Sequence, residues 1–212
     1  MSTENLKNTK NAACDAVTQS NNVQESIRNI VTQALEDGKM EPEAIKQTLN
    51  EVVEGACEGA KIKPQENADA LKEVINGVDS ALKQASIASK LAIEEASGNI
   101  QDFSDHDLKR ALNDLQDLES LFFDTLSEVA NQGKGTAHDT LKSLLNHLQS
   151  SGSSVGKSVN EILTGLHSDL SEGGRLQQIQ AADVAKATGA TVASIASGVL
   201  AGIADSLQAK DK

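Results

Sequence analysis

Large aromatic side chains are nearly absent from this sequence. Its 212 residues include no tryptophan and no tyrosine, and the three phenylalanines are Phe103, Phe122 and Phe123. Large aromatics normally contribute much of the buried area of a thick hydrophobic core. Their scarcity, together with many alanine, valine, serine and glycine residues, predicts thin helix-on-helix packing and argues against an enclosed ligand cavity.

Proline and cysteine are also scarce, with two residues of each. Two prolines are compatible with long helices. Cys14 and Cys57 lie far apart without the spacing of metal ligands, so we expect buried thiols in a reducing cytosol. The polar start MSTENLKNTKN has no apolar region, and no stretch has the apolarity of a transmembrane helix. We therefore expect a cytoplasmic protein.

Basic residues are outnumbered by acidic ones, 19 to 31, which gives a formal net charge of −12. Nucleic-acid binding is driven by lysine and arginine at phosphates, so this charge argues against a nucleic-acid partner. It also disfavours anionic bilayers, which attract basic amphipathic helices. A neutral apolar surface is compatible with it.

What the sequence does contain is an apolar residue at almost every eleventh position. Steps of eleven from Ala16 to Ile203 meet eighteen positions, here called the ladder, and sixteen are apolar although only 38% of the chain is. Eleven residues make three helical turns plus about 20°, so ladder positions fall along nearly one line of an α-helix. The columns four residues before and three residues after are also mainly apolar, which widens the line into a stripe.

The opposite helical face, five residues after each ladder position, is polar except at Ile87 and Gly98. No stretch keeps the period of two that strands need. We therefore predict an all-α protein of long amphipathic helices on an eleven-residue frame. We expect an elongated antiparallel bundle or a coiled-coil-like arrangement, with hinges at Pro42, Pro64, Gly98 and Gly173.

A 22-residue repeat, twice the ladder spacing, marks the segment 21–99. Lys39–Pro42 matches Lys61–Pro64, and Leu49–Gly55 matches Leu71–Gly77. Each proline suits the start of a helix, where its missing N–H has no intrahelical partner to lose. We predict a polar tail or frayed helix over 1–20, followed by short helices at about 22–37, 42–59 and 64–98.

Longer leucine-rich helices are predicted over 100–173. Ser104 is a suitable N-cap, and acids in the first turn favour the helix dipole. The helix reaches about residue 131, and glycines at 133 and 135 separate it from a helix at about 136–150. Gly152 and Gly156 weaken the next stretch, but the apolar frame passes through them without a change of phase.

The segment 174–212 is rich in alanine, glycine and serine, and we predict a helix over about 175–208. No charged residue occurs from Ala187 to Ala204. Such small residues, at a spacing of four, let two helices approach closely. This predicts a helix–helix contact in a bundle or oligomer, with interfacial or membrane insertion as the alternative. The small face consists of Ala190, Ser194, Gly198 and Gly202.

Two apparent motifs do not predict chemistry. Ser151–Ser158 resembles a phosphate-binding loop, but Gly152 is one residue too close to Gly156 and the stretch upstream has a helical pattern. No two histidines lie three or four residues apart, as a helical metal site requires. We therefore expect no catalytic residue, no cofactor, no metal ligand and no small-molecule substrate.

The eleven-residue frame with its proline-punctuated 22-residue units resembles exchangeable apolipoproteins, synucleins, perilipins and late-embryogenesis proteins. Low aromatic content, alanine-rich helices and acidity also resemble bacterial phasins, which coat polyhydroxyalkanoate granules. The resemblance implies a granule-associated amphipathic coat. The lack of basic residues beside the stripe departs from phospholipid-binding apolipoproteins, which favours a neutral polymer or oil-like surface.

Three functions fit these features. The first is a non-enzymatic coat on an intracellular apolar granule, with the stripe opening onto the polymer. The second is a soluble helical bundle or scaffold whose stripe stays internal and whose partners are helices, including those of a second copy in a homo-oligomer. The third is a stress-type protectant. The stripe residues expected to bind the surface or to pack are Leu115, Leu126, Leu144, Leu148, Val155, Val159, Leu166, Leu170, Val192 and Ile203.

Overall fold

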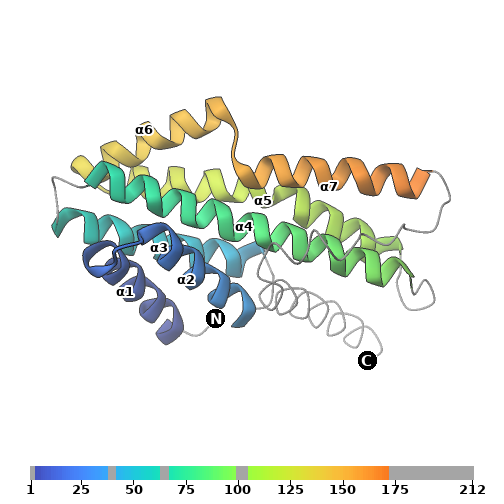
Figure 1. Ribbon diagram of the computed structural model, residues 1–212, viewed down its shortest axis with the longest axis horizontal. Coiled ribbons are helices and arrows are strands. Elements are labelled where there is room, and N and C mark those ends of the chain that lie inside the picture. The colour runs from blue at the N-terminus through green and yellow to red at the C-terminus, as the bar shows by residue number, and fades with distance from the viewer. Residues whose placement is uncertain (1–2, 38–41, 63–66, 99–104, 172–212) are drawn as a thin grey trace.

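The computed structural model describes residues 3–37, 42–62, 67–98 and 105–171, which form seven α-helices and no strand (Figure 1). The side chains are described for 4–35, 42–62, 67–94 and 112–166. The predicted all-α class is confirmed. Pro64, Gly173 and the predicted last helix lie outside the described residues.

Four antiparallel rows of helix form the body of the molecule (Figure 1). Three rows are single helices, α3 (Pro42–Ile62), α4 (Asn67–Gly98) and α5 (Asp105–Gln132). The fourth row consists of α6 (Thr136–Ser151) followed by α7 (Ser154–Ser171), which pack on α4 and α5. A period of 3.6 residues places the stripe of each helix toward its neighbours.

A hairpin of α1 (Thr3–Gln19) and α2 (Val23–Asp37) covers one side of this body, with α1 packed on α3 and α2 packed on α4. Residues 3–19 lie in the segment for which the sequence predicts a polar tail or frayed helix. They form a 17-residue helix in which Ala13, Ala16 and Val17 are buried. A short apolar face is enough to hold α1 against the bundle, because α3 offers a surface that α1 approaches closely.

Helix boundaries follow the predicted breaks at most positions. The third helix begins at Pro42, the fourth ends at Gly98 and the sixth begins at Thr136. The predicted apolar frame passes through Gly152, but the helix is interrupted there: α6 ends at Ser151 and α7 begins at Ser154. Gly152 has a φ of 79°, in the left-handed region that glycine enters without a steric penalty. The apolar pattern therefore continues while the backbone turns.

Candidate functional site: the internal apolar stripe

The ladder lies inside the bundle. Ladder residues from all seven helices are buried, and five of the largest are at 0% exposure. Of the ladder positions with a described side chain, Leu148 is half-buried and the others are buried. All seven helices contribute to one continuous apolar core. The buried ladder residues are Ala16, Ile27, Leu49, Ala60, Leu71, Leu82, Ile93, Leu115, Leu126, Ala137 and Val159.

The residues predicted to bind a surface or to pack are brought together in this core where the structure describes them. The buried ones are Leu115, Leu126, Val155, Val159 and Leu166. Two others on α6, Leu144 and Leu148, are half-buried and pack against the core. Outside the described side chains lie Leu170, Val192 and Ile203, together with the small face Ala190, Ser194, Gly198 and Gly202.

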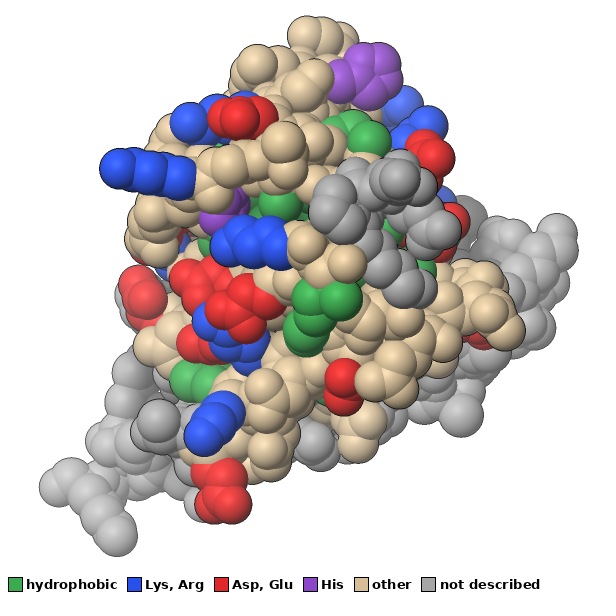
Figure 2. All heavy atoms as spheres, turned by 90° about the vertical axis from the view of Figure 1, so that its left-hand side faces the viewer, with side chains coloured by type: hydrophobic (Ala, Val, Ile, Leu, Met, Phe, Trp, Pro, Cys, Tyr) green, Lys and Arg blue, Asp and Glu red, His purple; other side chains and the backbone are tan. Residues whose placement is uncertain are grey.

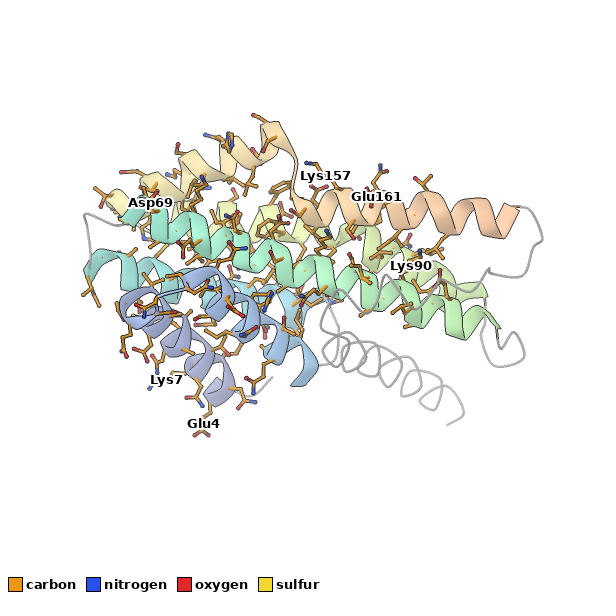
Figure 3. All side chains as sticks on the ribbon, in the orientation of Figure 1. Glu4, Lys7, Asp69, Lys90, Lys157 and Glu161 are labelled. Atoms are coloured by element: carbon orange, nitrogen blue, oxygen red, sulfur yellow. The ribbon has the colours of Figure 1, made fainter. Side chains whose placement is uncertain are left out.

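The described exterior is polar. Ile62, at the end of α3, is the single large hydrophobic side chain that is exposed in the described ranges. On the end face of the bundle in Figure 2, hydrophobic side chains appear as small separate areas between polar and charged ones. Figure 3 shows Lys157 and Glu161 on the outer side of α7, pointing away from the bundle. In this arrangement the stripe therefore faces other helices.

The contact between α1 and α3 depends on missing side chains. A Cβ at Gly55 would overlap the backbone carbonyl of Lys10, and one at Gly59 would lie 2.8 Å from the carbonyl oxygen of Cys14. The repeat places Gly77 of α4 in the position that matches Gly55, and a Cβ there would lie 2.6 Å from the carbonyl oxygen of Gln24. The repeated glycine thus allows α1 to pack closely on α3 and α2 to pack closely on α4.

Ion pairs line the edge of the α1–α3 contact. The Nζ atom of Lys10 lies 2.9 Å from Oε2 of Glu54 and 3.0 Å from Oε1 of Glu58. The hydrogen bond to Glu54, and then that to Glu58, raises the pKa of Lys10 although partial burial opposes the shift. These groups are partly exposed, so their contribution to stability is small compared with close packing.

A buried polar lock holds the start of α7. Asp79 of α4 accepts hydrogen bonds from the backbone N–H groups of Ser154 and Val155, at 2.8 and 2.9 Å. The hydroxyl of Ser153 accepts one from the N–H of Gly156 at 2.9 Å and donates one to Glu119 of α5. First-turn N–H groups lack intrahelical partners, so these bonds satisfy groups that burial would otherwise leave unpaired.

This lock occupies the backbone N–H groups of the stretch that resembles a phosphate-binding loop. The N–H groups that such a loop offers to a phosphate are bonded here to the chain's own carboxylate and hydroxyl. A Cβ at Gly156 would also overlap the carboxylate of Glu119, which would then have to move away from its hydrogen bond with Ser153. One turn further, Ser158 of α7 shares a buried hydrogen bond of 2.9 Å with Ser86 of α4.

The two cysteines differ in burial. Cys57 is buried, and burial raises the pKa of its thiol to about 11. Cys14 is half-buried, and burial, followed by the nearby charge of Asp15, also raises the pKa of its thiol. A raised thiol pKa lowers the fraction of reactive thiolate. Cys57 is also part of the apolar core.

In the described part of the chain, no group of three or more histidine, cysteine, aspartate or glutamate side chains is placed to hold a metal ion. Within the same ranges, no helix has the length and apolarity needed to cross a membrane. Two packing arrangements distinguish the described residues. The first is the glycine seams, where Gly55 and Gly59 of α3 contact α1 and Gly77 of α4 contacts α2. The second is the polar lock of Asp79 at the start of α7.

Sequence reasoning missed the lock and the glycine seams. No local pattern distinguishes Asp79 from a surface acid, because its partners at the start of α7 lie 75 and 76 residues away in the chain. The sequence marks Gly55 and Gly77 only as matching positions of the 22-residue repeat. The signal that identifies the seam is the Gly55–Gly59 spacing of four within a helical pattern, which is typical of close helix contacts.

A protein-family model matches residues 1–209, and it is described as a family of unknown function, DUF6781. The match covers nearly the whole chain, so the chain belongs to this family. No curated protein and no solved structure gives a significant match.

Proposed function

We propose that this member of DUF6781 is a non-enzymatic helical assembly module that keeps its apolar stripe inside the bundle and associates with a second copy. One observation carries the first part of the proposal. The ladder side chains are buried or half-buried wherever they are described, and Ile62 is the single exposed large hydrophobic residue of those ranges. A stripe that is used in this way stabilises the bundle and leaves a polar exterior.

The polar lock supports a stripe that stays closed. If α4 and α7 separated to lie on an apolar surface, Asp79 would lose its two N–H donors beside that surface. A carboxylate moved toward an apolar medium without hydrogen-bond partners is costly, and the N–H groups left behind add to this cost. The lock therefore favours the closed arrangement over an opened one.

The charge-free stretch Ala187–Ala204 is the proposed assembly surface. With a net charge of −12, two copies repel each other over most of their surfaces, and a charge-free segment is where they approach most easily. The chain already packs helices through small residues at Gly55, Gly59 and Gly77. The small face at 190, 194, 198 and 202 offers a second copy the same kind of contact.

Sedimentation velocity of the full chain over a range of concentrations tests this assembly. We expect a concentration-dependent dimer or larger oligomer for the wild type and a monomer for the double substitution Gly198→Leu with Gly202→Leu. Ala196→Leu adds a similar bulk on the opposite side of the predicted helix and should leave the oligomer intact. A wild type that stays monomeric at all concentrations contradicts the proposed assembly.

Coating of a neutral apolar granule is the second candidate. The helix ends at Pro42 and Gly98 favour it, because the bundle can open at such positions without breaking a helix. Burial of apolar area at ~25 cal/mol per Å² drives packing inside a bundle and adsorption to oil alike. Flotation with a triglyceride emulsion separates the candidates: the coat floats with the oil, whereas the closed module stays in the aqueous phase.

A further inference from the structure

The His138 ring fills the inside of the turn between α5 and α6. It lies in the first turn of α6 at 6% exposure, and a Cβ at Gly133 would overlap its Nε2, Cδ2 and Cε1 atoms. Its backbone N–H donates to the carbonyl of Gly135 at 3.0 Å. The ring is therefore packed directly on the connection that joins the end of α5 to the start of α6.

The Nδ1 atom of His138 is buried and has no hydrogen-bond partner in the described part of the chain. The charges that act on the ring are Lys61, from the end of α3, and Asp139 and Lys142 on α6 itself. Among the described residues, α4 and α5 also pack against α6 but add no charge to this set. A protonated ring would place a second N–H in this buried position, with two lysines nearby and one aspartate to oppose them.

We propose that His138 makes the α5–α6 turn an acid-sensitive latch, in which protonation of the packed ring loosens α6 from α5 and α4. The device is independent of the proposed assembly, because every group in it lies within one copy of the chain. Loosening of α6 would expose Leu141 and Leu145, which are buried in the closed bundle. Mild acid would thus uncover part of the apolar core.

The direction of the pH dependence follows from the two states of the ring. Burial, followed by the charge of Lys61, lowers the pKa of His138 from its ordinary value of 6.5. The folded turn therefore binds a proton less readily than the opened turn does. The latch is fully closed at pH values above 6.5 and weakens as the pH falls below it.

Hydrogen exchange of the full chain at pH 7.5 and 5.5, corrected for intrinsic exchange rates, tests the latch. We expect a several-fold increase in the opening of α6 amides at pH 5.5, with the amides in the centre of α3 unchanged. His138→Gln should remove the difference between the two pH values. His147→Gln changes an exposed histidine on the same helix and should retain it. Equal protection of wild-type α6 at both pH values would overturn the proposal.

Nuclear magnetic resonance titration of the wild-type histidines keeps the test valid if His138→Gln does not fold. We expect His138 to titrate below its ordinary pKa of 6.5, with chemical-shift changes in the amides of the α5–α6 turn that follow the His138 curve. Titration of His138 at or above pH 6.5, or turn amides that do not follow His138, would contradict the latch.

Discussion

The α1–α3 contact and the α4–α7 contact bring helices together by opposite means. At α1–α3 the side chains are removed: Gly55 and Gly59 let the backbone of α1 approach, and the charged partners stay at the edge. At α4–α7 polar groups are placed inside: Asp79 and Ser86 bond to the start and the first turns of α7. The first contact depends on space, and the second depends on paired polar atoms.

The two contacts therefore differ in what breaks them. A close backbone contact cannot give way locally, so any added atom must displace the whole helix. A buried polar contact fails when one partner is removed, because the other is left without a hydrogen bond. A chain with few aromatic residues stabilises its thin core with both devices.

The largest effect is expected at the glycine seam. Gly55→Ala places a Cβ against the carbonyl of Lys10, and we expect a loss of about 3 kcal/mol in the free energy of unfolding, together with reduced protection of α1 amides. Urea unfolding and hydrogen exchange measure the two effects.

Gly165→Ala is the matched control on α7, because a Cβ at that position meets nothing within 4 Å. Alanine favours a helix over glycine, so this variant should gain up to about 1 kcal/mol. Equal stability changes for the two variants would contradict the close-contact account of α1 and α3.

The next largest effect is expected at the polar lock. Asp79→Ala leaves the N–H groups of Ser154 and Val155 without their acceptor, and we expect a loss of about 2 kcal/mol. Asp69→Ala removes an exposed acid from the same helix and should change stability by less than about 0.5 kcal/mol. If the two substitutions cost the same in urea unfolding, Asp79 has no special role.

A smaller effect is expected at the N-cap of α7. Ser153→Ala removes the hydroxyl that accepts from the N–H of Gly156, and loss of such a cap costs about 1 kcal/mol. Ser153→Thr keeps a hydroxyl and should recover most of the loss. Ser154→Ala, one residue later at an exposed position, is the control for thermal denaturation and should be close to neutral.

The smallest effect is expected at the edge of the glycine seam. Lys10→Gln removes the pairs with Glu54 and Glu58, which are partly exposed, and we expect a loss of about 0.5 kcal/mol or less. The difference from wild type should shrink further at 1 M salt, where screening is strong. A large loss that persists at high salt would indicate that packing of the Lys10 stem, and not its charge, matters.

The fold class and most of the core followed from local pattern. An apolar stripe at helical spacing identifies the buried face of a helix wherever the neighbours are also helices, and Leu49, Leu71 and Leu126 are buried as the ladder predicts. Proline and glycine marked the ends of α3 and α4 because both act on the backbone of their own helix.

The features that sequence reasoning missed are those that depend on distant partners. Residues 3–19 have a short apolar face, and their helix is stabilised by a glycine surface about 45 residues further along the chain. Asp79 has the composition of a surface acid, and only the position of α7 makes it a cap. One sequence contains no direct record of which helix faces which.

The most direct test of the account is hydrogen exchange of the full chain, alone and with an excess of triglyceride emulsion. We propose that the ladder stays inside the bundle in both samples. We predict that amides of α3, α4 and α5 keep the same protection in both samples and that the chain melts cooperatively in each. Loss of protection in these helices, together with binding of the chain to the droplets, would contradict the account and favour a coat that opens its stripe onto oil.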